Sequence, residues 1–475
     1  MNSGGLRGNS PINWPESPGI TGRNPVECLA GFAWNGWPES VEYAQIAVMY
    51  RKPPFSIRTV IFQLLFGLLF MRPIPHAGAA TFTVNSGFDV NDLEPGNGLC
   101  VAYLVIIIPA VLPYCTLRGA IEEANNLPGD DTIILGSGTY RLSIAGQDED
   151  LAHSGDLDIT DSVHIIGAGV DKTFIDADKL DRVIDIHGPD TTVVLSGVSI
   201  INGNLLPGQA SHKGGGLRNQ GRLIMQQVTI SGNSVPVENG CNLGGGMYNN
   251  GRCSITNTTI KSNRAGTGGA VYNDRVGRLY ITSSTLYNNT SLQGGGIVNR
   301  GTVSLVNSTI TANTSSADNV AAVGALLNCG NMTLTNCTVA ANLAAGGTGG
   351  VYNEENLSMT NTLIADNDQD NCFLRAGIHS NGGNLDSGTT CGLFARNDDL
   401  FDREPLLAPL RNNGGPTPTM ALRPGSPAID AGIPLASITI DQRGLTRPRR
   451  KSFDIGAFEL NNMAIAPCIT PLLLP

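Results

Sequence analysis

The chain has 475 residues, of which 59 are glycine, and charged residues make up only 15% of the sequence. Disordered chains have fewer aliphatic residues and more charge, and collagens place glycine at every third position, so both classes are excluded. The formal net charge of −10 argues against nucleic acid or anionic lipid as partners.

The N-terminal part reads as two unrelated segments. Residues 1–48 hold all three tryptophans without periodicity, and we interpret them as mis-assigned upstream sequence or a disordered leader, with Met49 as the start. A genuine extended leader is the alternative. Residues 49–79 have the order of a signal peptide: basic residues, an apolar run over 60–71 and small residues at the end. We therefore expect a secreted or cell-surface protein.

Residues 80–130 are expected to form an N-terminal cap. The apolar spacing of Leu117, Ala120, Ile121 and Ala124 predicts a short amphipathic helix that covers the open end of the following strands. Export permits disulfides, and two local pairs are plausible. These are Cys100 with Cys115 and Cys372 with Cys391, although an apolar insert over 101–113 weakens the case for the first pair.

Internal repeats dominate residues 131–400. Seven segments follow the template h-x-h-x-x-h-x-h-x-x-N, in which h is apolar or small: 193–204, 223–233, 253–263, 279–289, 303–313, 332–342 and 357–367. Alternation within each half indicates two short strands joined by a bend, and a Gly-Gly-h-x-Asn block adds a third. Coils of about 24–30 residues that bury their apolar columns only by stacking predict an all-β parallel β-helix.

Two polar columns recur in these coils. The asparagines are expected to form a structural ladder of amide hydrogen bonds, with these members: Asn233, Asn263, Asn289, Asn313, Asn342 and Asn367. Tyrosines share an outward column at Tyr248, Tyr272 and Tyr352. Exposed stacked rings there would suit carbohydrate, and a plain solvated strand is the alternative reading.

The flanks of the repeats carry a family resemblance. The segment from Cys115 to Asn125 resembles the CSLREA-type region of exported bacterial proteins, with Thr116 in place of serine and Gly119 in place of glutamate. Residues 404–432 and 441–460, within a C-terminal region at 401–460, resemble choice-of-anchor Q proteins, and a tail follows at 461–475. The resemblance implies a pectin-lyase-like right-handed parallel β-helix, exported by a bacterium and often tied to the cell surface.

The repeats contain few candidate catalytic or metal-binding residues. The best acidic cluster could bind Ca²⁺, although a solvated loop is the simpler reading; its members are Asp148, Asp150, Asp156, Asp158 and Asp161. The basic residues of the coils are few, Arg218 among them, and none is expected to recur beside an acidic cluster at one corner. We therefore expect a monomeric, non-catalytic protein, without a transmembrane helix in the mature chain, that binds polysaccharide, a cell-surface glycan or another surface partner.

Two other functions remain open from the sequence. The pectin-lyase-like fold also hosts polysaccharide lyases and hydrolases, whose acidic residues here would come from 147–161 and 366–370. The short Gly-rich repeats are also similar to those of adhesin-like passengers.

Overall fold

The computed structural model describes residues 78–107, 110–207, 212–237, 242–319 and 322–461. The expected leader, nearly all of the expected signal peptide and all but the first residue of the tail lie outside these ranges. Within them, no helix is long and apolar enough to cross a membrane.

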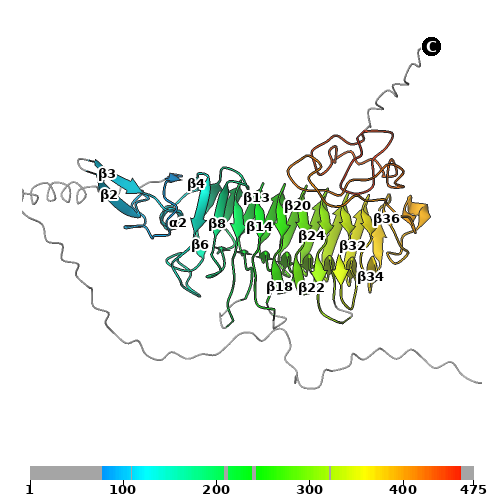
Figure 1. Cartoon of the computed structure of the whole chain (residues 1–475), viewed down its shortest axis with the longest axis horizontal. Coiled ribbons are helices and arrows are strands. Elements are labelled where there is room, and N and C mark those ends of the chain that lie inside the picture. The colour runs from blue at the N-terminus through cyan, green and yellow to red at the C-terminus, as the bar shows by residue number, and fades with distance from the viewer. Residues whose placement is uncertain (1–77, 108–109, 208–211, 238–241, 320–321, 462–475) are drawn as a thin grey trace, which may run out of the picture. The chain divides into compact units, whose positions relative to one another are not determined.

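The repeats form stacked parallel sheets, as Figure 1 shows. The first sheet has eleven strands, in this order: β1 (Thr81–Val84), β4 (Asp131–Leu135), β7 (Val163–Ile166), β10 (Thr192–Ser196), β13 (Arg222–Gln226), β16 (Arg252–Thr256), β20 (Arg278–Thr282), β24 (Thr302–Val306), β28 (Asn331–Thr335), β32 (Asn356–Thr360) and β35 (Ile378–Ser380).

The second sheet also has eleven strands: β5 (Gly138–Arg141), β8 (Thr173–Asp176), β11 (Ser199–Ile201), β14 (Thr229–Ser231), β17 (Thr259–Lys261), β21 (Thr285–Tyr287), β25 (Thr309–Thr311), β29 (Thr338–Ala340), β33 (Leu363–Ala365), β36 (Leu385–Asp386) and β37 (Leu400–Phe401). The third sheet has nine: β6 (Leu157–Ile159), β9 (Ile184–Ile186), β12 (Leu217–Asn219), β15 (Met247–Asn249), β19 (Val271–Asn273), β23 (Ile297–Asn299), β27 (Leu326–Asn328), β31 (Val351–Asn353) and β34 (Cys372–Leu374).

A short fourth sheet widens the central coils, with β18 (Arg264–Thr267), β22 (Thr290–Gln293), β26 (Thr314–Ser315) and β30 (Leu343–Ala344). Consecutive coils pair in parallel, and parallel crossovers are almost always right-handed. The predicted fold class, a right-handed parallel β-helix, is confirmed.

The core is built from columns of like side chains. In the first sheet Leu195 pairs with Met225, which pairs with Ile255, and all three are fully buried. Cys253 and Cys337 are free thiols buried in the same core. Stacking therefore supplies the burial that no single coil has.

The predicted asparagine ladder is present. Along it each amide nitrogen donates to the side-chain oxygen one coil further on, at 2.9–3.0 Å, from Asn233 to Asn367. A second ladder ends the strands of the third sheet and was not predicted. Its members are Asn219, Asn249, Asn273, Asn299, Asn328 and Asn353. Both ladders satisfy buried amides at the corners of the coils.

The N-terminal cap is a helix with a disulfide-closed hairpin beside it. Helix α2 (Leu117–Asn126) starts at Thr116, whose side chain accepts a hydrogen bond from the Gly119 amide, and it contacts β1, β4 and β6 at the end of the stack. The apolar insert forms the antiparallel hairpin β2 (Tyr103–Ile107) and β3 (Ala110–Tyr114). Cys100 and Cys115 form a disulfide at its base, and Cys372 and Cys391 form the other.

The C-terminal region packs on the second sheet. Outward threonines of successive coils bond to it: the Thr285 hydroxyl donates to the Pro418 carbonyl, and the Thr309 hydroxyl donates to Gln442. Ile455 and Phe458 pack with Leu363 of β33 in a separate apolar cluster. A 3-10 turn, η1 (Ala395–Asn397), precedes this region. The outward face of the second sheet is thus covered over these coils.

Candidate functional site

The candidate site lies on the third sheet, where charged side chains follow one another from coil to coil. Asp158 of β6 is in register with Asp185 of β9, and Asp185 is in register with Arg218 of β12. Each occupies the middle of a three-residue strand whose first residue is in the core, so alternation directs the charged side chain outward. Three residues that are distant in sequence thereby become neighbours.

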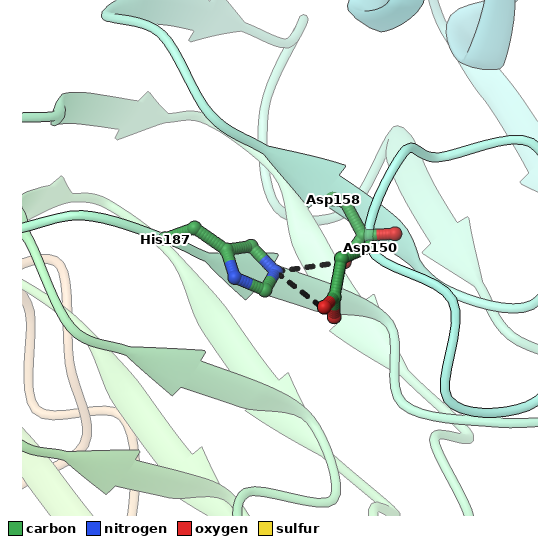
Figure 2. Close-up of side chains that lie close together, drawn as sticks. All are labelled: Asp150, Asp158 and His187. Atoms are coloured by element: carbon green, nitrogen blue, oxygen red, sulfur yellow. Dashed lines mark hydrogen bonds and ion pairs between the residues drawn. The ribbon is translucent and has the colours of Figure 1, made fainter. Parts of the chain in front are cut away.

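His187 closes one side of this cluster, and Figure 2 shows its ring beside Asp158 and Asp150. Its Nε2 lies 2.9 Å from Asp158 Oδ1, 3.5 Å from Asp185 Oδ2 and 3.9 Å from Asp150 Oδ1. The other oxygen of Asp158 accepts a hydrogen bond from the Ala152 amide. Asp158 is fully buried, whereas Asp150 reaches solvent, so His187 links the buried carboxylate to the surface.

Two arginines neutralise the other side. Arg182 Nε lies 3.0 Å from Asp156 Oδ2, and its Nη1 lies 3.3 Å from Asp185 Oδ2. Arg218 donates from Nε to Asp185 Oδ1 at 2.7 Å and forms a second contact with the other oxygen of the same carboxylate. Asp185 therefore forms a bidentate ion pair with Arg218, which is the strongest common geometry for an arginine and a carboxylate.

Burial and neighbouring charges shift the pKa values of the cluster in opposite directions. Burial raises the pKa of Asp156 well above its usual value, and Arg182 partly offsets this. Burial also raises the pKa of Asp158, against the hydrogen bond from His187. That same hydrogen bond raises the pKa of His187, against its partial burial. The arrangement favours a protonated histidine that pairs with a buried carboxylate.

Two overlapping sets of side chains have the geometry to bind a cation. Asp150, Asp158 and His187 offer ligand atoms within 4.8 Å of one another, and so do Asp156, Asp158 and Asp185. Carboxylate oxygens suit Ca²⁺. These oxygens already accept hydrogen bonds from His187, Arg182 and Arg218, however, so a cation would compete with the arginines and the histidine.

The structure brings only some of the five predicted Ca²⁺ ligands together. Asp156 and Asp158 are brought together in the buried network, and Asp150 stands at its edge. Asp148 and Asp161 belong to neither set of potential ligands among the described residues. Asp185 was missed, although residues 157–159 (Leu-Asp-Ile) and 184–186 (Ile-Asp-Ile) share one pattern a coil apart that would have revealed it.

The expectation that no basic residue of the coils lies beside an acidic cluster is wrong for Arg218, which pairs with Asp185 of the acidic set. The two residues are 33 positions apart in sequence and meet only because their strands stack.

The tyrosine column continues the same face of the third sheet. Tyr248 is in register with Tyr272, and their rings stack at 5.8 Å. The prediction of exposed rings is wrong, because Tyr248, Tyr272 and Tyr352 are only 3%, 5% and 5% exposed. The Tyr248 hydroxyl donates to Asp274, and the Lys213 ammonium lies 4.9 Å from the ring centre. Neighbouring side chains thus cover the rings, and a sugar has no access to them.

The first sheet, in contrast, keeps an exposed outward face. Two shallow grooves lie on it, with volumes of about 330 and 220 Å³. The larger is lined by Arg222, Arg252, Ser254 and Tyr280 together with intervening strand residues, and Tyr280 is 47% exposed. The smaller runs past Asn331 and Asn356 to His379.

Comparisons with known proteins add little to this geometry. No family model matches the sequence, and no curated protein matches it. The chain is similar in structure to the crystal structure of pectate lyase Pel9A, with 15% sequence identity and a TM-score of 0.42 over 81% of this chain and 96% of that one. At this identity and TM-score the likeness says nothing about what this chain binds or cleaves.

Proposed function

We propose that this chain is an exported bacterial cell-surface protein of the choice-of-anchor Q type that binds carbohydrate without cleaving it. The observation that carries the proposal is the outward face of the first sheet, with its two grooves, exposed hydroxyl and amide side chains, and Tyr280. Aromatic rings and hydrogen-bonding side chains on a regular surface are what sugar chains require.

The acidic cluster supports the non-catalytic reading. Catalytic carboxylates must reach the substrate, but Asp156, Asp158 and Asp185 are buried and paired with Arg182, His187 and Arg218. Such a network joins successive coils at the N-terminal end of the stack. Its role in this proposal is to hold the coils in register.

Export and surface location rest on the signal-like order of residues 49–79 and on the disulfides, which persist in oxidising compartments. Fractionation of bacteria that express the full chain tests this part. We expect the processed protein in the surface or culture fraction, and retention of the unprocessed chain in the cytoplasm would contradict it.

A polysaccharide lyase or hydrolase is the second candidate, and one observation favours it. Asp158 and Asp185 stand side by side with a burial-raised pKa at Asp158, and His187 connects them to the surface. Glycosidases use two neighbouring carboxyl groups, of which the general acid has a raised pKa. Ca²⁺ would bind at the all-carboxylate set of Asp156, Asp158 and Asp185 in this alternative.

One experiment separates the two candidates. Purified chain is incubated with a panel of polysaccharides, with and without Ca²⁺; retention is measured by affinity electrophoresis, and soluble products are measured by mass spectrometry. Retention without new products supports the binding function. Oligosaccharides that have lost the mass of water would establish a lyase, and hydrated ones a hydrolase; loss of either activity in Asp158→Asn would assign it to the cluster.

A further inference from the structure

A column of three arginines crosses the middle of the first sheet. Arg222 of β13 is in register with Arg252 of β16, and Arg252 is in register with Arg278 of β20. All three are exposed, and neighbouring strands place them roughly 4.8 Å apart. We call Arg222, Arg252 and Arg278 the arginine column.

The charge of this column is not compensated within the described part of the protein. None of its three guanidinium groups forms an ion pair there, whereas Arg218 of the third sheet and Arg182, which precedes β9, are both paired. No aspartate or glutamate occupies any strand of the first sheet from β7 to β35. Like charges on adjacent strands destabilise a sheet, so this arrangement works against folding stability.

The fold does not need arginine at these positions. The same column continues with Thr192 before Arg222 and with Thr302, Asn331 and Asn356 after Arg278. These neutral residues occupy equivalent places in the strand. Three successive arginines in an acidic protein therefore point to an external anion rather than to a structural role.

The surroundings of the arginine column suit a sugar chain. On β20 Tyr280 stands two residues from Arg278 on the same face and is in register with Ser254 and Ser304. The groove of about 330 Å³ runs between Arg222, Arg252 and this ring. Guanidinium groups bind carboxylates through paired hydrogen bonds, hydroxyls bind sugar hydroxyls, and the ring offers a flat apolar surface.

We propose that the arginine column and Tyr280 bind an extended acidic polysaccharide whose carboxylate groups lie along the axis of the stack. This inference rests on the proposed carbohydrate-binding function and names its ligand class. The spacing of the arginines is close to the length of one sugar residue in an extended chain, so a polymer with one carboxylate per sugar can engage successive coils. The net charge of −10 disfavours nucleic acid, whose binding needs a broad basic surface.

The test measures binding of the full chain to alginate, a polyuronate, and to the same alginate after esterification of its carboxylates. Affinity electrophoresis is run at about 0.15 M and about 0.5 M salt. We expect retention by alginate, loss of retention on the esterified polymer, and weaker retention at the higher salt. Arg252→Gln should weaken binding roughly tenfold, because it removes one charged contact, and Arg222→Gln/Arg252→Gln/Arg278→Gln should abolish it.

A matched variant controls for net charge. Arg264→Gln/Arg403→Gln/Arg423→Gln removes three exposed arginines that lie off the first sheet and should leave retention unchanged. Tyr280→Ala should weaken binding at both salt concentrations, whereas the effect of the arginine variants should shrink as salt rises. Circular dichroism checks that all variants remain folded, which exposed substitutions permit.

The failures are distinguishable. Equal retention of native and esterified alginate, or unchanged binding by the triple variant of the column, would overturn the acidic-ligand proposal and leave carbohydrate binding standing. Tighter retention by duplex DNA than by alginate would also overturn it. Absence of retention by every polysaccharide in the panel would refute the proposed function itself.

Discussion

Replacement of Asn289 by alanine tests whether the asparagine ladder holds the coils together. The Asn289 side chain is fully buried and donates from Nδ2 to the Ile260 carbonyl at 3.0 Å and to Asn313 Oδ1 at 2.9 Å. Its Oδ1 accepts from the Asn263 backbone amide and from Asn263 Nδ2, at 3.1 and 3.0 Å. One amide therefore ties its own coil to the coil before it and to the coil after it.

The magnitude follows from the groups that lose their partners. Alanine removes this amide from five groups, of which Asn313 Oδ1 keeps the Asn289 backbone N–H and the Tyr287 carbonyl keeps the Ser262 backbone N–H. The cost therefore comes from the other three: the Ile260 carbonyl, the Asn263 backbone N–H and one Asn263 side-chain N–H. At about 1–2 kcal/mol for each orphaned group, Asn289→Ala should cost about 3–6 kcal/mol of stability.

Urea denaturation followed by circular dichroism measures this cost, and amide exchange shows whether the loss is local to the two coils. Asn356→Ala is the matched control, because Asn356 is exposed and its amide makes one bond, to Asn331, at 2.9 Å. We expect the control to change stability by less than about 0.5 kcal/mol. Equal effects of the two substitutions would refute the reasoning, because the ladder would then contribute no more than a surface amide.

Three further predictions test the charged cluster and the corners. Asp185→Ala removes the carboxylate that pairs with the buried Arg182 and the half-buried Arg218, and it should lower the stability of the protein by about 3–5 kcal/mol in the same denaturation assay. Removal of the exposed Asp178 carboxylate is the control, and an equally small loss from both substitutions would contradict the structural role of Asp185. The hydrogen bond to Asp158 raises the pKa of His187 above its ordinary 6.5, so the stabilisation is complete below that value and is lost as pH rises through the raised pKa. His187→Asn should abolish this part of the pH dependence in thermal melts, and an unchanged profile would count against it. Gly269→Ala places a methyl carbon 2.5 Å from the Gly295 carbonyl oxygen and should cost more than about 2 kcal/mol, whereas Gly377→Ala meets nothing within 4 Å and should be nearly neutral.

The repeat pattern was sufficient to predict the fold, because the interactions that form each coil are between residues close in sequence and recur from coil to coil. Alternation marks the short strands, asparagine and glycine mark the corners, and like residues at like positions predict stacked columns. The Leu195 column, the ladder from Asn233 to Asn367 and the helix at Leu117–Asn126 all follow from that pattern. Local spacing also suggested both disulfide pairs, and the structure contains the Cys100–Cys115 bond despite the apolar insert that weakened the case for it.

The candidate site was only half visible in the sequence. Asp156 and Asp158 stood out as a local acidic run, but their partners Arg182, Asp185 and His187 come from the next coil, and Arg218 comes from the one after it. Coil lengths vary between repeats, so the residues that become neighbours across the stack are set by strand register and not by constant spacing.

Accessibility, too, was decided by tertiary structure. The outward columns of the first and third sheets look alike in sequence, but Lys213 and Asp274 cover Tyr248, while Tyr280 stays open beside the arginine column. The C-terminal region likewise settles on the second sheet through contacts such as that of Gln442 with Thr309. The sequence by itself determined the coil, because that depends on neighbours in the chain; only the folded structure decided which faces remain free, because that depends on which loops and side chains lie over them.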